Sequence, residues 1–158
     1  MVGIELAYQQ TDTPLARITL DLQHFLRNIR TQDKLTHGMG AFWHLGYGKM
    51  KGYFVQALFF FPADRPDTGP ALAKQIGEYW QQMVTQGSGR YYANEAEQEE
   101  YRYPGCLSVL PQREDTLDEV KWVVTAMTEM DFCARLVLPE GEPMCGEVRF
   151  DTTDDQLT

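Results

Sequence analysis

Cysteine and histidine are scarce in this sequence, whose 158 residues include three of each. The cysteines Cys106, Cys133 and Cys145 form no CxxC pair, which argues against a disulfide framework or a zinc site and for reduced thiols. No run of apolar residues approaches the ~18 that a membrane-spanning helix requires. No basic segment followed by an apolar run opens the chain, so we expect no signal peptide and a cytoplasmic location.

Basic side chains are also few compared with acidic ones. The chain holds 14 Lys and Arg against 23 Asp and Glu, a net charge of -9. The imbalance lies in one part of the chain, because residues 1–93 carry 9 basic and 7 acidic residues whereas 94–158 carry 5 and 16. A domain that neutralises phosphates normally runs basic, since counterion release drives that binding. Residues 94–158 therefore predict either a solubilising surface or a surface that meets a basic partner.

Apolar residues are plentiful, at 43% of the chain with 12% aromatic, which is enough for one domain with a hydrophobic core. We expect residues 1–138 to form this single domain. From Pro139 onward, proline, glycine and acidic residues predict a flexible, acidic tail over 139–158.

The spacing of apolar residues predicts an alternation of strands and helices. Strands are expected at 2–8, 41–47, 53–61, 106–110 and 132–138. The first helix should run from Pro14, with Thr13 as its N-cap, to about Gln32. The second should bury Leu72, Ile76, Tyr79, Trp80 and Met83 and end at Gly87; the third, opened by the capping box Thr116–Glu119, should bury Leu117, Val120, Val124 and Met127. The order β-α-β-β-α-β-α-β predicts an α+β fold with a mainly antiparallel sheet flanked by helices.

Several short stretches of the chain resemble a known family. They are Ile76–Trp80 (IGEYW), Gly87–Tyr92 (GSGRYY), Asn94 and Tyr101–Gly105 (YRYPG). Together they resemble the replication-initiator family of filamentous phages (inoviruses) and its bacterial prophage relatives, the YagK/YfjJ C-terminal-domain proteins. The resemblance covers about residues 41–138 and is most specific between 75 and 105. It implies an HUH-endonuclease-like (Rep-like) fold.

The resemblance also implies a DNA-nicking site, which the aligned residues do not supply. The family holds a divalent metal with two strand histidines two residues apart and attacks single-stranded DNA with a helix tyrosine, followed three residues later by lysine. Here the histidine positions are Phe54 and Gln56, and the tyrosine and lysine positions are Ala126 and Glu129. A supporting acid of the family falls near Gly46. The resemblance therefore implies a retained scaffold without catalytic residues.

The three histidines of the chain do not restore a metal site. His24 should lie packed or exposed on the first helix, and His37 should be exposed in a loop. His44 lies on the strand beside the motif strand, but no His, Cys or carboxylate stands two or four residues away from it. The sequence therefore predicts no bound metal and no cofactor.

A loop rich in tyrosine and glutamate is the predicted binding segment. Its members are Tyr91, Tyr92, Glu95, Glu97, Glu99, Glu100, Tyr101 and Tyr103. Aromatic side chains can stack on unpaired bases, but the intervening carboxylates repel a phosphate backbone. Two interpretations stay open: a solvated acidic loop, or an acidic surface that mimics nucleic-acid charge and engages a basic partner.

These observations lead to two hypotheses of function. The first is a non-catalytic, initiator-derived binding protein of a phage or mobile element in a bacterial cytoplasm. It would inhibit a host protein or ribonucleoprotein, such as a CRISPR effector complex, by occupying its basic surface. The alternative is a replication regulator or initiator that binds single-stranded or hairpin origin DNA, favoured by Arg90, Arg102 and the net charge of +2 in residues 1–93.

Overall fold

The computed structural model describes residues 1–32, 40–62, 69–93, 114–129 and 143–150. Its elements are β1 (Val2–Tyr8), α1 (Leu15–Asn28), β2 (Gly40–Gly48), β3 (Gly52–Phe60), α2 (Gly69–Glu78), β4 (Gly89–Ala93), α3 (Glu114–Glu129) and β5 (Cys145–Arg149). A 3-10 turn (Ile29–Thr31) follows α1, and a π-helical segment (Tyr79–Val84) continues α2.

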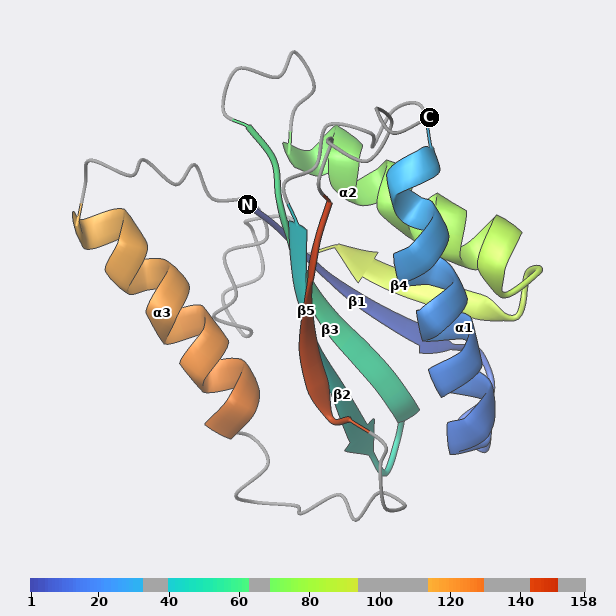
Figure 1. Ribbon diagram of the computed structural model, residues 1–158. Helices are drawn as coiled ribbons and strands as arrows, with labels where there is room; N and C mark the ends of the chain where they lie inside the picture. Colours follow the sequence, from blue (N-terminus) through green and yellow to red (C-terminus); the bar gives the residue numbers. More distant parts are fainter. Residues whose placement is uncertain (33–39, 63–68, 94–113, 130–142, 151–158) are drawn as a thin grey trace.

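The strands form one sheet in the order β4-β1-β3-β2-β5, and each neighbouring pair is antiparallel. The first four strands, with α1 after β1 and α2 after β3, follow the double split β-α-β order of ferredoxin-like domains. In Figure 1, α1 and α2 cover one face of the sheet and α3 lies on the other. The predicted α+β class with an antiparallel sheet flanked by helices is confirmed.

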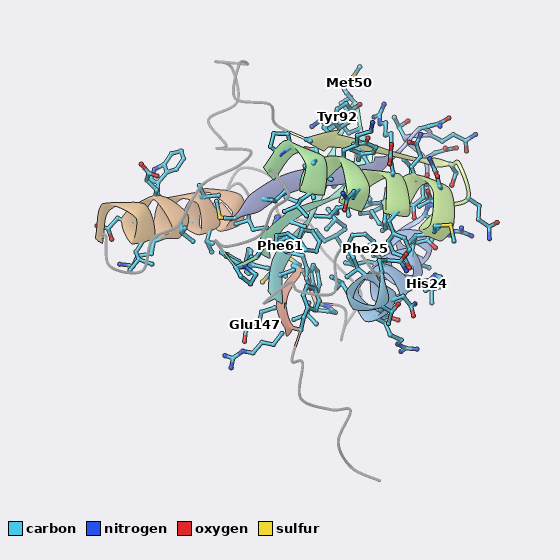
Figure 2. All side chains as sticks on the ribbon, turned by 90° about the horizontal axis from the view of Figure 1, so that it is seen from above. His24, Phe25, Met50, Phe61, Tyr92 and Glu147 are labelled. Carbon is cyan, nitrogen blue, oxygen red and sulfur yellow. The ribbon has the colours of Figure 1, made fainter. Side chains whose placement is uncertain are left out.

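The larger hydrophobic core lies between the sheet and the helices α1 and α2. Strand residues alternate between faces, so every second side chain of β1, β2 and β3 points into this core. These residues are Val2, Ile4, Leu6, Tyr8, Ala41, Trp43, Leu45, Val55, Ala57 and Phe59. Phe25 of α1 is labelled in Figure 2. Its ring meets those of Phe59 and Trp80 edge-on, with ring centroids 6.0 and 5.6 Å apart.

The π-helical segment positions Trp80, which is fully buried. Its indole Nε1 donates a hydrogen bond to the carbonyl oxygen of Ala7 at 3.1 Å, which ties α2 to β1. The segment ends where Thr85 bonds back to the carbonyl of Trp80, and Gly87 follows in the left-handed region at a φ of 88°. The predicted left-handed conformation of Gly87 is confirmed, but the helical segment already ends at Val84, and the left-handed stretch begins at Gln86, whose φ is 52°.

Four local predictions about the helices are wrong. The capping box Thr116–Glu119 does not open the third helix, because α3 already begins at Glu114. Met83 is 64% exposed, because the wider π turn rotates it away from the face that Trp80 buries. Leu117 is 38% exposed, since α3 contacts the sheet through Val123 instead. Thr13 does not cap α1: its hydroxyl donates to the carbonyl of Gln10, and the extended Pro14 is the N-cap.

Two strands lie where the sequence predicted none. β4 contains Tyr91 and Tyr92, the first two members of the predicted tyrosine- and glutamate-rich loop, and β5 lies inside the stretch expected to be a flexible tail. β5 pairs with β2, with Ala41 opposite Val148, and Phe150 is buried in the core. The strands predicted at 106–110 and 132–138 lie outside the described residues. Both observed strands are five residues long and take their stability from pairing with distant strands.

One buried polar cluster joins α1 to β1. Asp21 of α1, only 8% exposed, accepts hydrogen bonds from the Tyr8 hydroxyl and from Nε of Arg17, the latter at 2.7 Å. Burial and the charge of Asp21 raise the pKa of Tyr8 far above its ordinary value of about 10. The same carboxylate raises the pKa of Arg17 through its hydrogen bond.

The raised pKa of Tyr8 predicts a loss of stability at high pH. Above pH ~10 the unfolded chain releases this proton while the folded chain keeps it, so the free energy of unfolding falls as the pH rises. Tyr8→Phe should lower stability at neutral pH by about 1–3 kcal/mol, because Asp21 loses a buried donor, and should flatten the alkaline fall. Urea unfolding from pH 8 to 11 measures both. The exposed Tyr92→Phe is the control, and an equal flattening in it would contradict this account.

Candidate functional site

A row of side chains crosses the sheet on the face turned toward α3. Glu5 of β1 lies opposite Gln56 of β3, and Gln56 lies opposite His44 of β2. Tyr92 of β4 pairs with Glu5, and Cys145 of β5 pairs with His44, which extends the row to both edges. Directly paired residues share one face of a sheet and neighbouring strands lie about 4.8 Å apart. We refer to these five residues as the transverse row.

The carboxylate of Glu5 in the transverse row forms an ion pair with Lys51. Nζ of Lys51, from the hairpin that joins β2 and β3, lies 2.8 and 3.0 Å from the two carboxylate oxygens of Glu5. The same ammonium lies 5.1 Å from the ring centroid of Phe54. His44 is only 3% exposed. The carboxylate is therefore held by a neighbouring cation, with an aromatic ring beside it.

Phe54 fills the space next to the transverse row. Phe54 and Gly46 are opposite each other on β3 and β2, and Phe54 is 7% exposed. A Cβ placed on Gly46 would lie 2.6 Å from Cζ and 2.8 Å from Cε2 of Phe54. The phenyl ring therefore lies directly over the glycine, and no side chain fits at position 46 without moving it.

The three positions that the resemblance connects with metal binding thus lie together on one face. A packed ring stands at 54, an amide at 56 and no side chain at 46. Neither a phenyl ring nor a lone amide is a ligand set for Mg²⁺ or Mn²⁺. Among the residues that the structure describes, no group of three or more His, Cys, Asp or Glu side chains is arranged to hold a metal ion.

Helix α3 lies on the same face of the sheet as Phe54 and Gln56. Its Val123, 1% exposed, belongs to a second hydrophobic cluster with Leu58 of β3, joined by Phe42 and Val124. Figure 1 shows α3 on the side of the sheet away from α1 and α2. Ala126 and Glu129 fall within the C-terminal half of α3. Alanine at 126 brings no hydroxyl, and glutamate at 129 brings a negative charge where lysine was implied.

The structure separates the two tyrosines at the start of the predicted binding loop. Tyr91 packs against the core, and its ring leaves no room for a side chain on Gly77 of α2, whose Cβ would lie 2.2 Å from it. Tyr92 points to the opposite face and is 48% exposed, with the Arg90 guanidinium 5.5 Å from its ring centroid. The remaining members, Glu95, Glu97, Glu99, Glu100, Tyr101 and Tyr103, lie outside the described residues.

His24 is exposed on α1, in agreement with one of its two expected placements (Figure 2). His37 lies outside the described residues. His44 lies opposite Cys145, which local spacing could not predict because the two residues are more than a hundred positions apart in the sequence.

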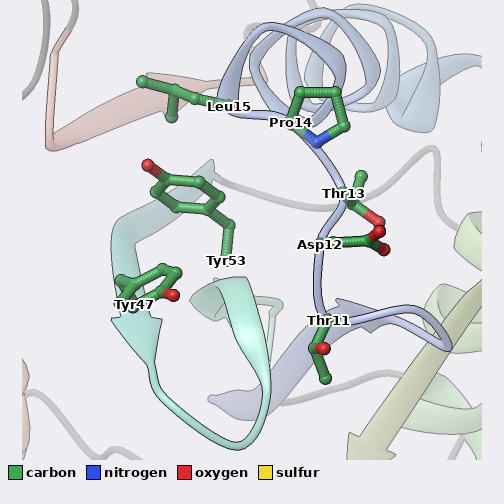
Figure 3. Close-up of a pocket in the computed structure, with 7 residues that line it drawn as sticks. All are labelled: Thr11, Asp12, Thr13, Pro14, Leu15, Tyr47 and Tyr53. Atoms are coloured by element: carbon green, nitrogen blue, oxygen red, sulfur yellow. The ribbon is translucent and has the colours of Figure 1, made fainter.

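A cavity of about 450 Å³ lies at the opposite face, between the loop after β1 and the hairpin (Figure 3). It is lined by Thr11, Asp12, Thr13, Pro14, Leu15, Tyr47 and Tyr53. Tyr47 and Tyr53 are cross-strand partners with ring centroids 5.0 Å apart. Among the described residues, its ionisable lining consists of one aspartate and two tyrosines, which form no general acid-base pair of the histidine–carboxylate kind.

Comparison of the chain with family models, with curated proteins and with solved structures finds no match. The resemblance to phage replication initiators therefore stays a prediction from the sequence. Among the described residues, no helix is long and apolar enough to cross a membrane.

The sequence contained a signal for the transverse row. On this face, β1, β2 and β3 each carry one polar side chain among apolar or glycine neighbours: Glu5, His44 and Gln56. Alternation alone places each of them on one face of its own strand. Their alignment across the sheet depends on the register of β1 against β3, which pairs Glu5 with Gln56, 51 positions further along the chain, and which local spacing cannot predict.

The packing of Phe54 on Gly46 predicts a specific mutational coupling. Gly46→Ala should destabilise the protein by about 1–3 kcal/mol, because the new methyl overlaps the phenyl ring. In a Phe54→Ala background the same change should cost far less, since the ring is gone. A thermodynamic double-mutant cycle from urea unfolding measures this coupling. Gly48→Ala is the matched control on the same strand face, where a Cβ meets nothing closer than 3.7 Å. Equal costs for Gly46→Ala in both backgrounds would contradict the packing.

Proposed function

We propose that this chain is a non-catalytic binding protein, derived from a replication initiator, that inhibits a host nucleic-acid-handling complex by occupying its basic surface. The observation that carries the proposal is the filled sheet face. Phe54 covers Gly46, Gln56 stands between Glu5 and His44, and Lys51 neutralises Glu5. A face packed in this way supports a scaffold function better than metal-assisted nicking.

The charge of the chain supports a basic partner. Its net charge is -9, and residues 94–158 contribute 16 acidic against 5 basic side chains. Such a charge attracts a protein or ribonucleoprotein whose nucleic-acid channel is lined by Lys and Arg, and it speeds their encounter. A CRISPR effector complex, which holds nucleic acid in a positively charged channel, is the target class that we infer.

The alternative, a regulator that binds single-stranded or hairpin origin DNA, is favoured by one local arrangement. Arg90 stacks on the exposed ring of Tyr92 at the edge of the sheet, and an aromatic ring beside a cation suits an unpaired base and its phosphate. The acidic excess of residues 94–158 opposes this alternative.

Three assays on the purified full chain separate these functions. With hairpin or single-stranded DNA in Mn²⁺, we expect no nicking and no covalent tyrosine adduct. We expect no gel shift of either DNA at 50 mM salt. In the third assay, the chain should inhibit target-DNA binding by at least one CRISPR effector complex from a purified panel.

The triple reversal Glu97→Lys, Glu99→Lys and Glu100→Lys should weaken inhibition if the acidic loop contributes. A covalent adduct would establish catalysis, and a salt-sensitive gel shift without inhibition would establish the regulator.

A further inference from the structure

Helix α3 turns a tryptophan toward solvent. Trp122 is 50% exposed, whereas the other two tryptophans of the chain, Trp43 and Trp80, are 8% and 0% exposed. The next residue, Val123, is buried against the sheet, so Trp122 stands on the part of the helix that turns away from it. A large amphipathic ring that the fold does not bury is a typical anchor for a partner.

The surroundings of Trp122 are acidic. Asp118 and Glu119 precede it by four and three residues, so both lie beside it on the helix surface, and both are exposed. Lys121 is paired with Asp118 at 2.9 Å, which leaves Glu119 as the neighbouring charge without an opposing partner among the described ion pairs. Over its whole length α3 carries Glu114, Asp115, Asp118, Glu119 and Glu129 against one lysine.

We propose that the outer side of α3, centred on Trp122 with Asp118 and Glu119, is the surface that docks on a partner protein rich in Lys and Arg. This inference rests on the proposed function and assigns its main contact to the helix rather than to the loop that begins at Tyr91. Trp122 enters a pocket of the partner, and the carboxylates meet cations at its rim.

Charge favours a Lys- and Arg-rich protein at this surface over a nucleic acid or a second copy of the chain. A nucleic acid would bring phosphates against Asp118 and Glu119, which costs affinity instead of supplying it. A second copy of the chain would bring two acidic helices together, and like charges across an interface are unfavourable. A Lys- and Arg-rich protein surface gains binding affinity from contacts with both the tryptophan and the carboxylates.

The test uses the full chain and two probes: the effector complex inhibited in the panel above, and a synthetic amphipathic peptide of Lys and Leu. Trp122→Ala should weaken inhibition about 25-fold or more, the loss typical of a tryptophan hot spot. Leu20→Ala, which truncates an apolar residue of α1 that is even more exposed, at 64%, should leave inhibition unchanged. Glu119→Lys should slow association and reduce its dependence on salt.

Fluorescence supplies a second readout that does not depend on inhibition. Since Trp122 is the exposed tryptophan of the three, its emission should shift to shorter wavelength when either probe covers it, and Trp122→Phe should abolish that shift. Thermal unfolding checks that Trp122→Ala and Trp122→Phe fold like the parent chain.

The outcomes separate the two proposals. Undiminished inhibition by Trp122→Ala and by Glu119→Lys would overturn the α3 surface and leave the proposed function standing. No inhibition of any complex, together with a peptide-induced shift that Trp122→Phe removes, would overturn the proposed function and support the α3 surface. No inhibition and no shift would overturn both. DNA that shifts the emission and competes with the peptide would assign the surface to nucleic acid and overturn the protein partner.

Discussion

The register between β2 and β3 is the constraint on which the rest of this structure depends. Nine residue pairs join these strands, from Gly40 opposite Phe60 to Gly48 opposite Gly52. Gly52 holds the register at the hairpin, because its φ of 74° is a left-handed conformation and a side chain there would lie 2.2 Å from the carbonyl oxygen of Thr11. A shift of one residue would exchange the two faces of the strand.

That register gives the two faces of the sheet different roles. On one face, the large apolar residues of three strands meet Phe25 and Trp80 and form the main core. On the other, it places Phe54 over Gly46 and Gln56 beside His44, while Val123 of α3 covers Leu58. This packing supports the proposed non-catalytic function, because a phenyl ring occupies the space over Gly46.

Local pattern predicted much of the fold. β1, α1, β2 and β3 follow from alternation and helical spacing, and Gly87 marks a helix end by its left-handed conformation. β4 and β5 escaped prediction because short strands such as Cys145–Arg149 contain few apolar residues and depend on partners far along the chain. The exposure of Met83 could not be predicted, because it results from a π-helical turn that residue spacing does not indicate.

The candidate site was predictable in part. Strand alternation places Phe54 and Gln56 on one face, and the sequence already showed that neither position carries a histidine. The meeting of Glu5, His44 and Cys145 in the transverse row required the sheet order, and the exposure of Trp122 required the position of α3. Both depend on tertiary contacts rather than on local sequence.

The most direct test of the central claim, that the sheet face beneath α3 is a packed surface and not a metal site, is paramagnetic broadening by Mn²⁺ in amide-resolved NMR spectra. We expect the amide signals of Gly46, Phe54 and Gln56 to keep their intensity at Mn²⁺ concentrations that broaden exposed acidic residues such as Asp118 and Glu119. Selective, saturable broadening of signals along β2 and β3, centred on Gln56 and His44, would contradict the claim.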